Sequence, residues 1–341
     1  MNDPDEVLAV ALGWARQGRN VALATVVATR GSSPRPVGAR LAVESGGRFA
    51  GSVSSGCVEG EILAAAEEVI ASGRPALRQF GAHPEGIWSA ALTCGGTIRI
   101  LIERLAQIDE LQALLDQARA GHESATLLTL GDGRRHPLDS AIASWEEPDR
   151  GIVLAAARAG KAMLIETHGG VHFLEFWRPP PRLLIVGAVH IAQSLAPMAR
   201  LAGYDVTVID PRAAFADPER FPGTKLKRAW PEEVLAASPP DARAALVALS
   251  HEARIDDPAL RTALNSPAFY VGALGSRASA EKRRARLAAH GVAESALARL
   301  HGPVGLAIGA ATPAEIAIAI AAEMTEALRL ASPARLDAAA E

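Results

Sequence analysis

The feature that most constrains the fold is a regular alternation of strand-like and helix-like segments in the second half of the chain. Short apolar runs are typical of buried strands, and the amphipathic segments between them are typical of helices. The predicted strands are 183–186, 205–209, 244–249 and 268–271, and the predicted helices are 190–201, 258–264 and 278–290. Strands that alternate with helices form right-handed βαβ units, in which helices cover both faces of a parallel sheet. We therefore predict a Rossmann-like parallel-sheet domain over residues 183–332.

The first half of the chain has a different pattern, in which strands follow one another with fewer helices between them. Helices are predicted at 5–17, 59–72 and 105–120, and strands at 21–29, 40–43, 48–53 and 97–103. Three shorter strands between residues 124 and 177 are expected to complete the same sheet. This pattern predicts a mixed α/β domain over residues 1–178.

Three consecutive prolines, Pro179 to Pro181, separate the two patterns. Proline lacks a backbone N–H donor and has a fixed φ, so the run favours a stiff extended connector that continues neither a helix nor a strand. We place a linker over residues 179–182. A chain of 341 residues has room for about two domains of ~100–200 residues, which agrees with this division. The predicted fold class is α/β, with the mixed domain first and the Rossmann-like domain second.

Charge and hydropathy argue against several classes of protein. The 35 Lys and Arg residues against 38 Asp and Glu give a net charge of −3 without a run of like charge, so no nucleic-acid partner is expected. The N-terminus has neither the basic nor the apolar stretch of a secretory signal. Pro313, Glu315 and Glu323 interrupt the most apolar late segment, so no membrane span is expected. With only two cysteines, no disulfide framework is expected, and the cytoplasm is the expected location.

The turn after the first Rossmann strand resembles a dinucleotide-binding fingerprint but departs from it. Gly187 takes the place of the first glycine of G-x-G-x-x-G, and Asp210 follows the second strand, where an acidic residue would bind a ribose. Val189 takes the place of the second glycine, and Ala192 takes the third. Because the second glycine lets the backbone approach the pyrophosphate, a β-branched residue there would crowd the ligand. The turn therefore predicts the fold, and NAD(P) is not the expected cofactor.

Ligands of open α/β sheets bind outside the carboxyl ends of the strands, so the loops at that edge hold the candidate residues. These residues are Gly187, His190, Asp210, Arg212, His251, Ser276 and Arg277. Gly275-Ser276-Arg277 precedes a predicted helix, and backbone N–H groups, a hydroxyl and a guanidinium suit an anionic oxygen such as a phosphate. The alternative is that Ser276 only caps the helix and Arg277 forms a surface ion pair.

Several common catalytic motifs are missing from the sequence. His251-Glu252 does not belong to H-E-x-x-H, because Ile255 stands in the fifth position. No C-x-x-C occurs, so a structural zinc site is not expected. Neither tyrosine begins the Y-x-x-x-K of short-chain reductases.

A cysteine, Cys57, lies in a loop of small residues, 51–59, that enters a predicted helix. The positive end of a helix favours a thiolate, which makes Cys57 a candidate metal ligand. Cys94 is in a similar setting, before Gly95-Gly96 and a predicted strand. The alternative for each cysteine is a small buried core residue. A redox sensor that uses both cysteines would require their sulfur atoms within bonding reach.

Six segments resemble successive signatures of the XdhC/CoxI family, the xanthine dehydrogenase accessory proteins. In chain order they are 31–35, 51–59, 94–96, 246–252, 272–277 and 303–317. The resemblance extends from about residue 7 to 330, so it covers both predicted domains.

The resemblance implies a non-catalytic chaperone that binds the molybdenum cofactor, as molybdopterin or its cytosine dinucleotide form. Such a chaperone would hold the cofactor while a cysteine desulfurase exchanges an oxo for a sulfido ligand, and would then insert it into an apo-molybdoenzyme of the xanthine dehydrogenase class. A homodimer is also implied. In the first domain the cofactor-binding residues would be Ser33, Arg35, Cys57, Glu59 and Cys94, with Cys57 as the metal ligand.

The chain departs from the family pattern at three places on the Rossmann side. Val189 replaces a glycine, Ser250-His251-Glu252 replaces Thr-His-Asp, and Ala307 replaces Asp. The alternative function is an NAD(P)-dependent oxidoreductase built on the same Rossmann fold. Val189 and the missing Tyr/Lys pair argue against it.

Overall fold

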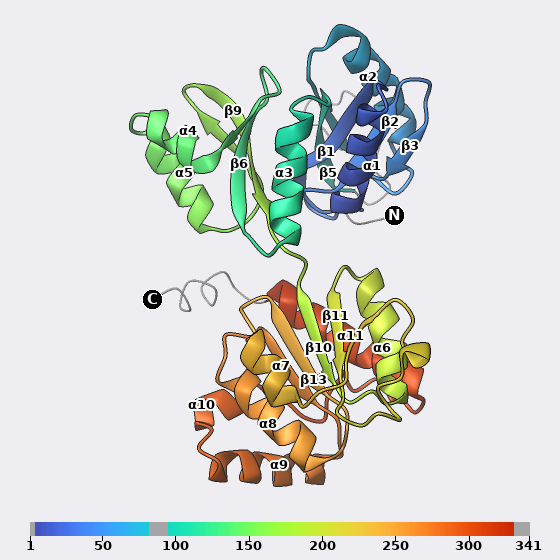
Figure 1. Ribbon diagram of the computed structural model, residues 1–341. Helices are drawn as coiled ribbons and strands as arrows, with labels where there is room; N and C mark the ends of the chain where they lie inside the picture. Colours follow the sequence, from blue (N-terminus) through green and yellow to red (C-terminus); the bar gives the residue numbers. More distant parts are fainter. Residues whose placement is uncertain (1–3, 82–94, 331–341) are drawn as a thin grey trace. The chain divides into compact units, whose positions relative to one another are not determined.

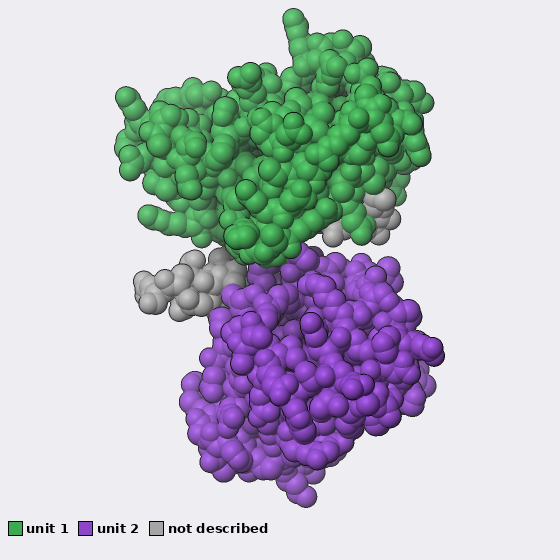
Figure 2. Space-filling view, in the orientation of Figure 1, with its two compact units in different colours: residues 1–179 green, residues 180–341 purple. Residues whose placement is uncertain are grey.

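The computed structural model describes residues 4–81 and 95–330. The chain divides into two compact units, Met1–Pro179 and Pro180–Glu341, shown in different colours in Figure 2. The division falls within the proline run. Across the described residues, no helix is both long and apolar enough to cross a membrane.

The first sheet of unit 1 is antiparallel, with strand order β3-β2-β1-β5-β4 (Figure 1). Its strands are β1 (Val21–Arg30), β2 (Arg40–Glu44), β3 (Phe49–Gly51), β4 (Ala76–Gly81) and β5 (Thr97–Arg104). Helix α2 (Glu59–Ser72) covers one face, where Ile62 and Val69 join the apolar side chains of β1 and β5. Helices α1 (Pro4–Arg16) and α3 (Ile108–Arg119) cover the other face.

The later part of unit 1 forms a sheet of its own. Its strands are β6 (Ser124–Thr129), β7 (Arg135–Pro137), β8 (Met163–Thr167) and β9 (Gly170–Trp177), in the order β7-β6-β9-β8, with helices α4 (Leu138–Ser144) and α5 (Asp149–Arg158). The expectation that these strands complete the first sheet is wrong. Strand β9 pairs with β8 on one side and with β6 on the other, so the segment satisfies its own hydrogen bonds.

Two kinds of contact join the sheets of unit 1. Val27 and Leu101 of the first sheet form an apolar cluster with Leu128 and Phe173 of the second. Beside this cluster four charged side chains are buried together: Arg40, Glu103, Arg135 and Glu175. Each sheet contributes one arginine and one glutamate, so every charge has a partner of opposite sign.

Unit 2 is the predicted Rossmann-like domain, and its parallel sheet confirms the fold class. The strands are β10 (Arg182–Val186), β11 (Asp205–Ile209), β12 (Lys225–Lys227), β13 (Ala244–Ala248), β14 (Tyr270–Ala273) and β15 (Leu300–His301). Their order, β12-β11-β10-β13-β14-β15, is the order of dinucleotide-binding folds, with the crevice between β10 and β13.

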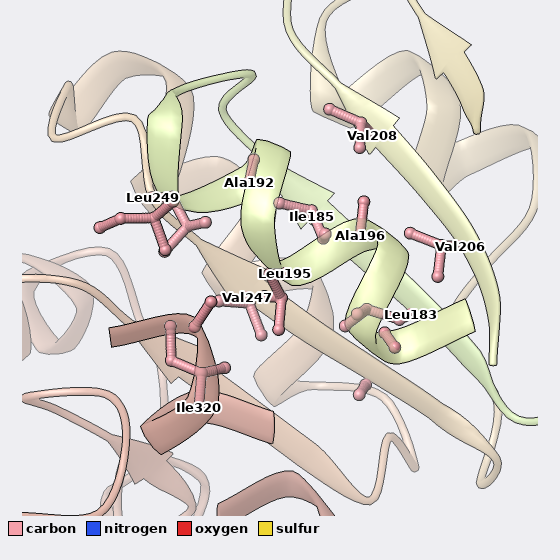
Figure 3. Close-up of a cluster of buried hydrophobic side chains, with 14 of the residues drawn as sticks. Leu183, Ile185, Ala192, Leu195, Ala196, Val206, Val208, Val247, Leu249 and Ile320 are labelled. Atoms are coloured by element: carbon pink, nitrogen blue, oxygen red, sulfur yellow. The ribbon is translucent and has the colours of Figure 1, made fainter. Parts of the chain in front are cut away.

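Helices cover both faces of this sheet. They are α6 (His190–Leu201), α7 (Pro231–Ala237), α8 (Ala253–Leu264), α9 (Arg277–Ala289), α10 (Glu294–Leu297) and α11 (Pro313–Leu330), with a short 3-10 helix at Pro218–Arg220. Figure 3 shows Leu195 of α6 and Ile320 of α11 packed against Ile185 and Val247 of the strands. Helices α7, α8, α9 and α10 pack on the opposite face. Burial of each large apolar side chain contributes about 1.5–3 kcal/mol, and these two layers fix the strand ends that carry the candidate residues.

Candidate functional site

The candidate residues of unit 1 lie at one end of its first sheet. Arg30, at the end of β1, pairs with Thr97, at the start of β5, and Gly51, at the end of β3, pairs with Leu41 of β2. The loops 31–39 and 52–58 therefore leave the sheet at the same end (Figure 1). This placement brings the loops of Ser33, Arg35, Cys57 and Glu59 to one sheet edge. Cys94 lies outside the described residues.

The Cys57 loop has a backbone shape that small residues favour. Ser55 and Gly56 have φ angles of 61° and 109°, in the left-handed region that few side chains tolerate. Val58 is buried and caps helix α2, and Cys57, one residue earlier, is exposed. The loop therefore places the thiol of Cys57 at the surface beside the N-terminus of α2. Its exposure argues against the alternative of a core cysteine.

Glu59 binds this loop from inside. Its Oε1 accepts hydrogen bonds from the Ser52 hydroxyl (2.7 Å) and the Ser54 backbone N–H (3.0 Å). Its Oε2 accepts from the Ser54 hydroxyl and the Gly56 backbone N–H. Burial alone would raise the pKa of Glu59, but the bonds from Ser54 and Ser52 lower it to about 2. An ionised carboxylate with four donors is a positioning group for the loop.

Ser33 and Arg35 belong to a loop that is packed closely against the start of β5. The Ser33 hydroxyl donates to the Arg35 carbonyl oxygen at 2.7 Å, and the Arg35 side chain is half-buried. A Cβ at Gly96 would lie 1.9 Å from the Ser32 carbonyl oxygen, so only glycine allows this approach. The second glycine after Cys94 thus has a steric purpose.

In unit 2 the candidate residues come from the carboxyl ends of β10, β11, β13 and β14. Gly187 has a φ of 104°, and a Cβ there would lie 2.6 Å from the Ser250 backbone nitrogen. Glycine therefore lets the turn after β10 touch the turn after β13. His190, at the start of α6, and His251, with a φ of 62°, are both exposed at this edge.

The carboxylate of Asp210 is fully used within the protein. It is buried, and it accepts from the Ala188 backbone N–H (2.8 Å) and from the backbone and side chain of Arg212 (2.7–2.9 Å). Burial would raise the pKa of Asp210, but these bonds hold it below its ordinary value. The four bonds fill the acceptor positions of a carboxylate, so a ribose could reach Asp210 only if Arg212 moved.

Arg212 is also held from its other side. Its Nη1 donates to Glu252 at 2.7 Å, and its guanidinium stacks on the Phe215 ring, 3.9 Å from the centroid. Opposite charges, hydrogen bonds and stacking together fix the guanidinium across the strand ends. The ribose-binding region of the crevice is therefore occupied by the protein's own side chains.

The Gly275-Ser276-Arg277 turn combines both predicted readings. Ser276 caps α9 by accepting from the Ser279 backbone N–H at 3.2 Å. Arg277 is exposed, and among residues 4–81 and 95–330 it has no ion-pair partner within 4.0 Å. The cap of the alternative reading is present, whereas its surface pair is not formed.

Sequence reasoning missed the buried polar residues beneath this edge. Ser250 donates to Asp256 at 2.6 Å, and Asp256 faces Arg283 at 3.7 Å. Burial raises the pKa of Asp256. Ala280, Arg283 and Leu287 are buried together on α9, so the helical spacing of Arg283 with two apolar residues was the available signal.

A cavity of about 640 Å³ on the four-stranded sheet was also missed, and none of the predicted site residues lines it. His172 lies at its wall, with a Thr hydroxyl 3.2 Å from each ring nitrogen, and burial lowers the pKa of this histidine. At the rim, His168 pairs with Asp149 at 2.9 Å. Within the described ranges, no group of three or more His, Cys, Asp or Glu residues could hold a metal ion.

The fold and these two edges define a class of protein: a mixed α/β unit with an exposed cysteine, joined to a Rossmann unit whose dinucleotide turn is altered. Two family models match the chain in order. The XdhC and CoxI family model matches residues 14–81, and the XdhC Rossmann domain model matches residues 183–324. The chain belongs to the XdhC and CoxI family.

Relatives match over most of their own length. The molybdenum cofactor insertion chaperone PaoD of Escherichia coli (strain K12) is 27% identical over 95% of this chain and 88% of its own. A probable xanthine dehydrogenase component of Bacillus subtilis (strain 168) is 26% identical over 89% of this chain and 92% of its own. A crystal structure of a xanthine dehydrogenase from Bacillus halodurans has a TM-score of 0.75 at 23% identity, covers 96% of both chains and shows the same fold.

Proposed function

We propose that the protein is a chaperone that binds the molybdenum cofactor and inserts it into a molybdoenzyme of the xanthine dehydrogenase class. The observation that carries this proposal is the exposed Cys57 on a loop that Glu59 holds in a fixed shape. A thiolate is a soft ligand, and the cofactor presents a metal bound by sulfur at one end and a phosphate at the other. The likeness to PaoD over nearly the whole chain supports the same role.

In this proposal, Cys57 binds the molybdenum end of the cofactor and Glu59 keeps the loop open for it. Ser33 and Arg35 leave the same sheet edge and supply a hydroxyl and a cation for the polar part of the ligand. Cys94 is proposed as a second thiol. On the Rossmann side, the proposed residues are Gly187, His190, Asp210, Arg212, His251, Ser276 and Arg277, with Asp210 and Arg212 shaping the edge through their mutual bonds.

The finer parts of the proposal come from the family resemblance. They are that the cofactor is bound as molybdopterin or its cytosine dinucleotide form, that a cysteine desulfurase acts on the bound cofactor, and that the chain is a cytoplasmic homodimer without catalytic turnover of its own. Each has its own measurement: mass analysis of the released pterin, pull-down with the desulfurase, and sedimentation of the purified chain.

The central test is to express the chain together with cofactor biosynthesis and to analyse the purified protein for molybdenum and oxidised pterin. We expect both in stoichiometric amounts, and we expect an apo-molybdoenzyme to gain activity when it is mixed with the loaded protein. The control is the same protein from cells that cannot make the pterin. Hydride transfer from NAD(P)H to carbonyl substrates without any bound pterin would favour the oxidoreductase alternative and overturn the proposal.

A further inference from the structure

The turn that leads from β14 into α9 carries a set of unused hydrogen-bond donors. Among the described residues, no protein acceptor lies within reach of the backbone N–H groups of residues 275–278, and the first bonded N–H of the turn is that of Ser279. Four successive free donors at the start of a 13-residue helix form a concave, positively polarised surface. Arg277 adds an exposed guanidinium to the same turn.

A second, independent observation lies directly beneath the turn. The Arg283 side chain is 7% exposed, and its Nε and Nη1 have no hydrogen-bond partner. The guanidinium points back along α9, and its Nη2 donates to the Leu274 carbonyl oxygen at 3.1 Å. Its Nη1 lies 3.8 Å from the place that a Cβ would take at Gly275. Only the glycine backbone therefore separates this buried cation from the turn.

The nearby carboxylates do not satisfy Arg283. Asp256 is 3.7 Å from Nη2 and Asp257 is 4.0 Å from Nε, which is too far for a hydrogen bond in either case. Asp257 instead forms two bonds with Arg286, at 2.6 and 3.0 Å. Two guanidinium nitrogens thus remain without a partner in a place where leaving them unpaired is costly.

We propose that this turn, 275–278 with Arg277 and the underlying Arg283, is a binding site for a phosphate monoester or diphosphate group. The backbone N–H groups and Arg277 bind the phosphate oxygens directly, and Arg283 is a positioning residue that holds the turn through Leu274 and adds positive potential from below. Gly275 keeps the turn free of a side chain. The site is at the carboxyl edge of the sheet, where ligands of this fold bind.

The source of the phosphate rests on the proposed function, but the site itself does not. In a molybdenum cofactor chaperone the group is the phosphate end of the cofactor. A nucleotide would offer the same chemistry, so the test uses inorganic pyrophosphate as the probe and separates the two sources by competition.

The experiment is calorimetric titration of the full chain with pyrophosphate at low salt, where surface charges are least screened. We expect binding that Arg277→Gln weakens about tenfold, because charge-assisted hydrogen bonds are lost. Lys282→Gln is the matched control, since it removes one positive charge from an exposed position of the same helix. Arg283→Met should also weaken binding, and Arg283→Lys should restore part of it. Melting temperatures show whether the buried variants remain folded.

Absence of pyrophosphate binding would overturn the site, and so would equal losses for Arg277→Gln and Lys282→Gln. If the cofactor is the source, protein loaded with it no longer binds pyrophosphate. If a nucleotide is the source, ADP competes with pyrophosphate and the bound cofactor does not. Stoichiometric molybdenum without pyrophosphate binding would reject this site and leave the proposed function standing. Pyrophosphate binding without molybdenum would do the reverse.

Discussion

The guanidinium of Arg135 and the carboxylate of Glu103 face each other as a two-bond fork across the sheets of unit 1. Nη2 donates to Oε1 at 2.6 Å and Nη1 donates to Oε2 at 3.2 Å. Glu175 accepts from Nε of the same arginine at 3.3 Å and from Arg40 on its other oxygen. All four side chains are at most 6% exposed, so the ion network acts as a joint between two sheets.

Arg135→Met should therefore destabilise unit 1 by about 3–5 kcal/mol, because it leaves two buried carboxylates without a common partner. Arg134→Met is the control, since the neighbouring arginine is exposed. Urea unfolding followed by far-UV circular dichroism measures the difference between the two variants. Equal midpoints would show that the network contributes nothing beyond its desolvation cost.

The sequence predicted the Rossmann unit well because its signals are local. Helix α6 spans 190–201 and strand β11 spans 205–209, as predicted, since buried parallel strands are continuous apolar runs and the helices between them are amphipathic. Helix α8 begins at residue 253 rather than 258, because Pro258 lies inside the helix and was taken for its first turn. Strands β12 and β15 have three and two residues, too few for a periodic pattern.

The second sheet of unit 1 and the buried ions could not be predicted in the same way. Alternation of apolar residues identifies strands such as β6 and β9 but says nothing about which strands pair. Arginines such as Arg283 are normally exposed, and only the assembled fold shows which one is buried. The Cys57 loop was predictable because its small residues directly encode an unusual backbone, whereas the saturation of Asp210 by Arg212 depends on side-chain geometry.

Glu59→Gln should loosen the Cys57 loop, because an amide group brings donors toward the Ser54 and Gly56 N–H groups that now donate to a carboxylate. We expect faster hydrogen exchange at both N–H groups and loss of bound molybdenum. Glu61→Gln is the control, since it removes the same charge from the first turn of α2 without touching the loop. Unchanged exchange in Glu59→Gln would contradict the positioning role.

The same pair of proteins gives a pH test of Glu59. Its pKa is lowered to about 2 from an ordinary value of 4.5, so its stabilising effect is fully present above pH 4.5. The effect should disappear as the pH falls through about 2, where the folded protein takes up the proton. The difference in loop protection between the parent and Glu59→Gln should therefore be constant from pH 7 to 4.5 and shrink below that. A difference that already vanishes at pH 4.5 would disagree with the lowered pKa.

Gly187→Ala should be strongly destabilising, by about 1–3 kcal/mol or more, because it combines a positive φ with a close contact. The new Cβ would lie 2.6 Å from the Ser250 backbone nitrogen. Gly291→Ala separates the two effects, since Gly291 has a φ of 84° and open space around its Cα. Thermal unfolding of both variants measures them; a similar drop in melting temperature would mean that the contact with Ser250 costs nothing.

NAD should bind only weakly to the unaltered protein, and Val189→Gly should strengthen binding. Val189 replaces the glycine that lets a pyrophosphate approach the turn, and Asp210 offers no unoccupied acceptor to a ribose. Val189→Ala should give an intermediate affinity, because it removes only part of the side chain. Calorimetry with NAD tests this order. Tight binding to the unaltered protein, weakened by the glycine, would reverse the interpretation of the turn.

Cys57→Ala should abolish binding of the molybdenum cofactor and leave the fold intact, whereas Cys94→Ala should have a smaller effect. Because Cys57 is exposed, its loss opens no core cavity, and the change in stability should stay within about 0.5 kcal/mol. Cys57→Ser should also lose molybdenum, since a hydroxyl is a hard ligand of similar size.

Ser55→Ala is the matched control for Cys57→Ala, because Ser55 is an exposed neighbour in the same loop. Molybdenum content, oxidised pterin and melting temperature are compared among the four variants and the parent. A large drop in melting temperature for Cys57→Ala would show that the cysteine is structural. Undiminished molybdenum in Cys57→Ala, at an unchanged melting temperature, would show that the cofactor is held without this thiol and would transfer the main binding role to the phosphate end, where Arg35 and Arg277 are the candidate cations.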